Sequence, residues 1–473
     1  MPFANEFAHH KILGRFVENP EVKTLLESCR EPVYPDEGTL PVCEVERRNW
    51  KPKYVVAIDG SHREILYDKG FPGAELSFIS IANVLINVDK LIVESSKATI
   101  DPVEFNKVQS AYTLTVALPS TNMVREGFPD SRTSFRDAWA HLLQNTRPAE
   151  KSETLQETYA ALLKNKPTDS EQKCPLMDLC LEKDSPRPDY EKGRCGCGKH
   201  PAFLSDALRI HERFSDTGSN GESFGEVMRV LEHLVLVSYL RHMERICNES
   251  GTWTMFEDTA IVMDGSLAVF GHPAWLSQAI KTELARINDL VKEKTGSDIL
   301  VFGIEKSGRF FDHWCRLDTK NKRDFERERE AAEATGESPN FVVIEPGRLP
   351  KKSVLLVDDS YIKKYVVPSE SSKPHGKDTY YGRPFLYKTS TGAMIVGISS
   401  ILCDDHDDRS KAGLDQFPRL PDMLDLLDLL VSMRYPNAVI PLIAAHAEAA
   451  IPLQMGEKVL DKLAREHIGK SGT

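Results

Sequence analysis

Apolar runs of the length of buried strands recur along the chain, separated by longer segments with helical spacing. The strand-like runs fall at 54–58, 76–86, 259–263, 299–304, 341–345, 354–357, 384–387 and 393–398, where 76–86 could form one or two strands. Apolar residues at helical spacing predict helices at 5–29, 133–165, 224–247, 274–294, 420–433, 438–450 and 456–467. Because the two kinds of element are mixed rather than strictly alternating, the pattern favours a mixed α/β or α+β sheet over a regular doubly wound one.

The apolar pattern weakens between residues 166 and 222, which are rich in Pro, Gly, Asp, Lys and Ser. A chain of 473 residues is too long for one ordinary core. We therefore expect a helical extension at 1–50, the first part of the core at 51–165, an inserted module at 166–222, and the second part of the core with C-terminal helices at 223–473.

Composition indicates a globular protein in an aqueous compartment. Hydrophobic residues make up 41% and charged residues 28% of the chain. No apolar run approaches the roughly 20 residues that span a bilayer, and the N-terminus lacks the basic and apolar regions of a secretory signal. We expect a cytoplasmic protein without membrane contact.

The net charge of −11 argues against a nucleic-acid footprint spread over the whole surface, which is usually basic. It allows a nuclease, because a carboxylate-rich active site adds negative charge until metal binds, and basic groups can be local. The chain has neither a GxGxxG after a strand nor a Walker lysine motif, so no nucleotide site is predicted.

The tripeptide Asp-Gly-Ser occurs twice, each time after a five-residue, mostly apolar run, as Asp59-Gly60-Ser61 and Asp264-Gly265-Ser266. A buried strand that stops at an acid followed by glycine places a carboxylate at the end of a sheet, where a ligand can approach closely. Two such acids predict a divalent-metal site that acts on a phosphodiester. The alternative is two ordinary strand–turn junctions.

Four of the nine cysteines cluster within 24 residues, as Cys174, Cys180, Cys195 and Cys197. Four thiols in a segment with almost no core of its own predict a tetrahedral structural zinc site. The spacings of five and one intervening residues differ from those of the common finger, and His200 is a possible replacement for one thiol. Four reduced cysteines in a loop remain the alternative.

Four stretches resemble, in content and order, the motifs of NurA nucleases. They are Ala57-Ile58-Asp59-Gly60-Ser61, 261–267, the strand leading to Lys306, and the closing 434–446, which runs from Arg434-Tyr435-Pro436 to His446. The resemblance implies an RNase H-like core, a Mn²⁺ or Mg²⁺ cofactor and partnership with a HerA-type motor ATPase. The long gap that holds the cysteines departs from the simplest family members.

The resemblance assigns roles to individual residues. Asp59 and Asp264 are expected to bind the metal, Lys306 to contact the phosphate, and His446 to act as metal ligand or proton donor. Other positions stay open: Glu94 or Glu257 as a third acid, Arg434 as a phosphate clamp or helix cap, and Asp358-Asp359 as an alternative ligand pair.

The prediction is therefore a metal-dependent DNA nuclease with an RNase H-like mixed sheet flanked by helices and an inserted cysteine-rich zinc module. It is expected to act on DNA ends or single strands, in end processing or in defence against foreign DNA, as a homodimer on a hexameric HerA-like ATPase. The alternative is a non-catalytic subunit of the same fold that regulates a DNA translocase. A different phosphotransfer enzyme is disfavoured because no nucleotide loop is present.

Overall fold

The computed structural model describes residues 11–30, 40, 42–67, 71–95, 108–167, 174–177, 180, 188–318, 349–432, 437–452 and 455–468. The predicted strand at 341–345 and Arg434 lie outside the described residues, and so does the charged run at 319–337, for which the sequence predicts an exposed helix.

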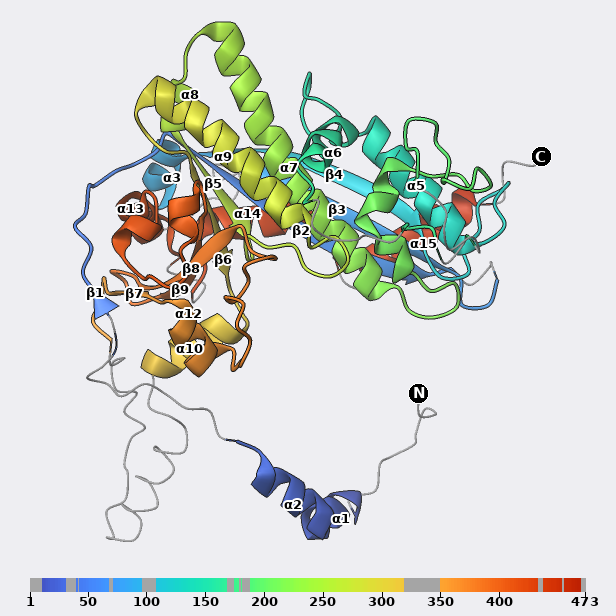
Figure 1. Ribbon diagram of the computed structural model, residues 1–473, viewed down its shortest axis with the longest axis horizontal. Coiled ribbons are helices and arrows are strands. Elements are labelled where there is room, and N and C mark those ends of the chain that lie inside the picture. Colours follow the sequence, from blue (N-terminus) through green and yellow to red (C-terminus); the bar gives the residue numbers. More distant parts are fainter. Residues whose placement is uncertain are drawn as a thin grey trace.

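A nine-stranded sheet forms the centre of the molecule, with the order β1-β7-β8-β9-β6-β5-β2-β3-β4 (Figure 1). Its strands are β1 Val42–Cys43, β2 Tyr54–Leu66, β3 Glu75–Asn87, β4 Gln109–Pro119, β5 Thr259–Asp264, β6 Leu300–Glu305, β7 Val354–Leu356, β8 Gly382–Lys388 and β9 Met394–Ser400. β2, β3 and β4 form an antiparallel meander, whereas β5 pairs in parallel with both β2 and β6. The remaining pairs are antiparallel, so the predicted mixed α/β sheet is confirmed.

Helices cover both faces of the sheet. One core cluster joins Val56 and Ile58 of β2 to the apolar residues of α5, α6, α7 and α9. The other joins Val55 and Ala57 to α13 and α14. Because successive strand residues point to opposite faces, the apolar run of β2 feeds both cores at once. α7 and α9 lie side by side across the sheet (Figure 1).

The helices that position these cores are α5 Ser131–Asn145, α6 Leu155–Lys164, α7 Gly221–Ser250, α9 Leu276–Thr295, α13 Leu420–Leu430 and α14 Ile440–Ala449. Peripheral α-helices are α1 Lys11–Glu18, α2 Pro20–Ser28, α3 Val88–Ser95, α8 Thr254–Glu257, α10 Arg309–Asp318, α12 Asp359–Tyr361 and α15 Met455–His467. A π-helical turn spans Ile362–Val366, and 3₁₀ turns span Leu204–Leu208, Ile210–Glu212, Asp404–Asp407 and Leu414–Gln416. Even the 30-residue α7 lacks a stretch apolar enough to cross a bilayer, and so do the other described helices.

Two features of the sheet differ from the sequence prediction. β4 was not predicted, although Leu114 and Leu118 are buried and alternate with exposed positions, as expected for a half-buried edge strand. β2 does not stop at Asp59, because it continues to Leu66 and pairs with β3 throughout. The first Asp-Gly-Ser is therefore part of a strand, and only the second marks a strand end.

Candidate active site

Asp59 and Asp264 meet where the parallel pairing of β2 with β5 ends. The register pairs Ile58 of β2 with Met263 of β5, so the two aspartates are the next residues of each strand. Strand alternation places both on the face covered by α14, together with Val262. The structure thus brings together two acids that are about 200 residues apart in the sequence.

Lys306 and His446 each contact one of these aspartates. The Lys306 Nζ, directly after β6, donates to Asp264 Oδ2 at 3.0 Å. The His446 Nδ1, on α14, lies 3.0 Å from Asp59 Oδ2, within hydrogen-bond distance. The His446 side chain is 62% exposed, so it reaches the buried aspartate from the solvent side. All four predicted residues are therefore neighbours.

The two glycines of the repeated tripeptide serve different purposes. Gly265 has φ +90°, which favours glycine, and it turns the chain after β5. Gly60 is extended, but a Cβ there would lie 2.6 Å from Glu232 Oε1 of α7. The first glycine is required because α7 approaches β2 closely, and not because the chain turns.

Glu232 is the third acid of the site, and the sequence analysis missed it. The side chain is 4% exposed, lies on α7 and interacts electrostatically with both Asp59 and Asp264. One sequence feature could have identified it. Glu232 is a single acid between Leu231 and the apolar run that begins at Leu234, on a helix predicted to face the core.

Neither acid proposed from the sequence lies on the part of the fold that carries the aspartates. Glu257 is exposed and lies just before β5, at the opposite end of the strand from Asp264. Glu94 lies on α3, which directly follows β3. The last residue of β3 pairs with Tyr54 at the start of β2, away from Asp59.

Burial raises the pKa values of three carboxyl groups of the site, and repulsion between acids adds to the effect at two of them. Burial, and then Asp264, raise the pKa of Asp59 to about 6, against the opposing effects of Lys306 and His446. Burial raises the pKa of Glu232 to about 8; Arg229 opposes this, while Asp59 and Asp264 add to it. Burial also raises the pKa of Glu305, the last residue of β6, to about 7, again against Arg229. Such a site is short of positive charge.

The carboxylates line an open cleft of about 630 Å³ at the ends of the parallel strands. Crevices outside the carboxyl ends of parallel strands are the usual ligand sites of open α/β sheets. The cleft is lined by Asp59, Gly60, Met228, Arg229, Glu232, Asp264, Gly265, Ser266, Phe270, Glu305, Lys306, Ser307, Gly308, Arg309, Phe310, Val367, His375 and Tyr380.

The chemistry of the carboxylate donors suits a hard divalent cation. Asp59, Asp264 and Glu232 offer only carboxylate oxygens, which Mg²⁺ and Mn²⁺ prefer. A bound cation would replace Lys306 as the partner of Asp264 and would favour the ionised forms of Asp59 and Glu232, which burial disfavours.

Asp358 and Asp359 are engaged elsewhere. Asp358 caps α12 by accepting from the Tyr361 N–H at 2.8 Å. Asp359 pairs with Lys363 at 2.7 Å and accepts from the His375 N–H at 2.5 Å. The pair therefore supports a cleft residue, and neither aspartate lines the cleft itself.

The cysteine-rich segment gathers its sulfur atoms into one cluster. Donor atoms of Cys180, Cys197 and His200 all lie within 4.8 Å of one another, the only such set of three among the described residues. Cys195 Sγ lies 2.6 Å from Cys197 Sγ, and Cys174 is close enough for the other three thiols to raise its pKa, after burial as the main cause. All four predicted cysteines and His200 are thus together.

The cysteine-rich segment is fixed to the main core by a buried ion pair. Arg136 of α5, 2% exposed, donates to both carboxylate oxygens of Asp206 at 2.9 and 2.8 Å. It also donates to the Pro201 carbonyl at 2.8 Å. His211 reaches back to the Pro175 carbonyl at 2.7 Å, next to Cys174. These contacts hold the cluster at a defined place beside α5.

The family model of the NurA domain matches residues 53–451. The chain belongs to the NurA family. The match includes every residue of the carboxylate cleft and the cysteine-rich segment between its two aspartates.

Several solved NurA structures are similar to the chain. The NurA nuclease of Sulfolobus solfataricus is 11% identical, with 98% of each chain covered and a TM-score of 0.36. A second NurA structure is 10% identical, covers 98% of this chain and 99% of its own, and has a TM-score of 0.26. A NurA bound to dAMP and manganese is 11% identical, covers 96% of this chain and 94% of its own, and has a TM-score of 0.24. No curated protein matches the chain.

Replacing Glu232 by glutamine should stabilise the metal-free protein at high pH. The folded-state pKa of about 8 lies above the ordinary value of 4.5, so the wild type loses stability as the pH rises between these values. Glu232→Gln removes this loss. In EDTA, its Tm should exceed that of the wild type by at least about 2 °C at pH 8.5, with little difference at pH 5.

Thermal unfolding across this pH range, followed by fluorescence, makes the measurement. Glu257→Gln is the matched control, because that acid is exposed and should leave the Tm unchanged. An equal Tm difference at pH 5 and pH 8.5 would contradict the assignment of a buried, proton-holding carboxyl.

Proposed function

We propose that the protein is a divalent-metal-dependent deoxyribonuclease acting on DNA ends or single strands. The observation that carries this proposal is the adjacency of Asp59 and Asp264 where the parallel pairing of β2 and β5 ends, with Glu232 buried nearby on α7. Family membership adds independent support. The antiparallel meander joined to two parallel strands, with an acid on the first strand, supports an RNase H-like core.

Asp59, Asp264 and Glu232 would hold Mn²⁺ or Mg²⁺. When bound, the metal supplies an activated water and stabilises negative charge on the phosphate. Lys306 is released from Asp264 and provides a fixed positive charge for the phosphate. His446 holds a proton next to Asp59 and can give it to the leaving oxygen, or bind metal itself.

A scaffold without catalysis is the weaker hypothesis. The feature that would have favoured it is the lack of a third acid, and Glu232 fills that place. The cleft also keeps Lys306 and His446 beside the aspartates. We therefore retain the enzyme as the proposed function.

Asp59→Asn and Asp264→Asn should each abolish DNA cleavage while the protein stays folded. Loss of a metal-binding carboxylate should lower the rate about a thousandfold or more, because the metal supplies several kcal/mol of charge stabilisation. The assay follows labelled linear duplex and single-stranded DNA with Mn²⁺ or with chelator. Asp289→Asn, on the exposed face of α9, is the control and should retain full activity. Cleavage by Asp59→Asn at the wild-type rate would refute the site.

We also propose that the cysteine-rich segment is a zinc module. A Cys-rich donor set with one histidine suits a closed, structural zinc site, with no open position for catalysis. The small core of Leu176, Cys195 and Ala202 buries too little apolar surface to fold alone, so the metal would stabilise it.

Elemental analysis should find about one zinc per chain in protein purified without chelator. Cys180→Ser and Cys197→Ser should lower the zinc content and make the segment sensitive to proteolysis. Cys403→Ser, which changes an exposed cysteine far along the sequence, should keep the zinc. Wild-type protein free of zinc would contradict the module.

We further propose that a homodimer works on a hexameric HerA-like ATPase in the cytoplasm. The family resemblance suggests the partner, and the charge balance gives a physical reason. A chain with net charge −11 and no nucleotide motif is poorly suited to capture and pull duplex DNA alone, since capture depends on basic groups. A motor that threads DNA into the nuclease would supply both capture and force.

The association should be salt-sensitive, and the nuclease alone should be weakly active on duplex DNA. Size-exclusion chromatography with light scattering tests the chain alone and mixed with the ATPase encoded beside it, at low and high salt. A strict monomer that ignores the ATPase and degrades duplex at full rate would refute the assembly while leaving the nuclease assignment intact.

A further inference from the structure

Four aromatic side chains form a continuous row along the cleft. Phe270 contacts Tyr380 edge-on, with ring centroids 5.4 Å apart. Tyr380 contacts His375 at 5.6 Å, and His375 contacts Phe310 at 5.9 Å. All four line the same cleft as the carboxylates. We call this row of Phe270, Tyr380, His375 and Phe310 the aromatic wall.

Phe270 is the open end of the aromatic wall. Its side chain is 41% exposed, whereas Phe310 at the other end is buried. The loop that carries it is fixed, because the Val269 N–H bonds to the Thr379 carbonyl at 3.1 Å and to the Ser277 Oγ at 2.8 Å. A large apolar ring is therefore held rigidly in a polar cleft, six residues after Asp264.

Two arginines of the cleft have no carboxylate within ion-pair distance in the described part of the chain. Arg229 comes from α7, and Arg309 is the exposed first residue of α10. Both line the cleft together with Phe270. Arg229 interacts electrostatically with Glu232 and Glu305, but neither arginine is held by a carboxylate in direct contact, so both are suited to bind phosphate oxygens.

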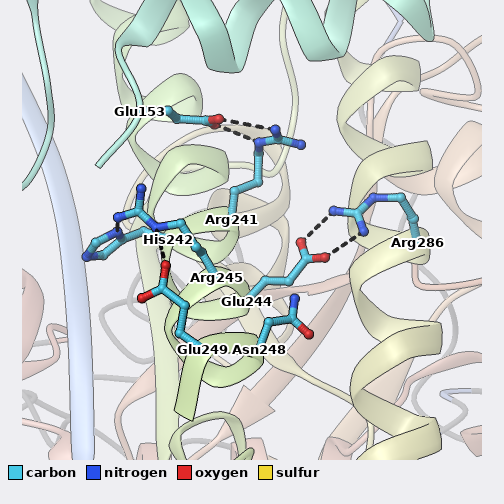
Figure 2. Close-up of a pocket in the computed structure, with 8 residues that line it drawn as sticks. All are labelled: Glu153, Arg241, His242, Glu244, Arg245, Asn248, Glu249 and Arg286. Carbon is cyan, nitrogen blue, oxygen red and sulfur yellow. Dashed lines mark hydrogen bonds and ion pairs between the residues drawn. The ribbon is translucent and has the colours of Figure 1, made fainter. Parts of the chain in front are cut away.

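A second pocket, at the C-terminal half of α7, differs from the cleft because its arginines are already paired with carboxylates. Figure 2 shows Arg241 bound by Glu153, and Arg286 bound by Glu244. Glu283 contacts both arginines as well. Because each arginine there has its carboxylate, that pocket is a structural network rather than a phosphate site.

We propose that Phe270 is a stacking platform for one unpaired base of the strand being cut, while Arg229 and Arg309 bind its phosphates. This rests on the proposed nuclease function and names the state of DNA that the cleft accepts. Flat aromatic rings beside positive charge are the usual device for binding single strands, and stacking tolerates every base. A cleft of about 630 Å³ has the size of pockets that hold small ligands, which is enough room for one or two nucleotides.

The consequence concerns duplex substrates. Bases in a duplex are stacked on each other and paired, so their faces are closed to Phe270. Duplex DNA must therefore be opened before its strand enters the cleft, and cutting should begin at frayed or single-stranded ends. The preference is for unpaired DNA of any sequence.

An abasic scan tests the stacking directly. A set of short single-stranded oligonucleotides carries one abasic residue at each successive position, and binding is measured by fluorescence anisotropy with Ca²⁺ at fixed salt. For the wild type, one abasic position should weaken binding about 5- to 150-fold. Phe270→Ala should bind the intact oligonucleotide that much more weakly, and should lose the sensitivity to that position.

Three variants separate stacking from simple packing. Phe270→Trp should keep the abasic sensitivity, whereas Phe270→Leu, which fills space without a ring, should lose it. Phe71→Ala removes another exposed phenylalanine, outside the cleft, and should bind like the wild type. Equal weakening of intact and abasic DNA by Phe270→Ala, or a wild type with no sensitive position, would overturn the proposal.

Cleavage with Mn²⁺ in place of Ca²⁺ keeps this test separate from the nuclease assignment. A wild type that shows the sensitive position but never cleaves DNA would refute the proposed activity and retain the stacking site. A wild type that cleaves DNA but shows no sensitive position would refute the stacking site and retain the proposed activity.

Discussion

The burial of like charges where two parallel strands separate governs this structure. Asp59 and Asp264 are fixed by strand register, and Glu232 by its place on α7, so none can move away from the others. Burial and repulsion then favour the protonated acids, as the raised pKa values of Asp59 and Glu232 indicate. Lys306 offsets part of the repulsion by donating a hydrogen bond to Asp264. The fold thus holds carboxylates in an arrangement that a divalent cation would stabilise.

Glycines allow the elements around the acids to pack closely enough for this arrangement. Gly60 makes room for Glu232 of α7 against β2. Gly303 of β6 makes room for the turn after β5, because a Cβ there would lie 2.4 Å from the Gly265 carbonyl oxygen. Packing on the α7 side of the sheet therefore depends on positions that have no side chain, as protein interiors are close-packed.

Local patterns predicted the parts of the site that lie on strands. Asp59 and Asp264 each follow an apolar run, and the parallel register of β2 and β5 places the residues after these runs side by side. Glu232 was missed because its partners come from the packing of α7 on the sheet, which no local pattern encodes. β4 was missed because an edge strand buries only one face. Glu94 and Glu257 were wrong candidates because closeness in sequence to a strand does not say at which end of the strand an acid lies.

Arg136 bears on attempts to build a smaller enzyme from this fold. Its guanidinium is 2% exposed, and its carboxylate partner Asp206 belongs to the cysteine-rich segment. Excising 166–222 to shorten the chain would remove the carboxylate partner of Arg136, together with Leu208, Ile210 and Phe214, which pack in the same core. The shortened core would therefore need new side chains over the surface that this segment covers. The cysteine-rich segment is packed as part of the core beside it, so the two can be transplanted only together or after repacking.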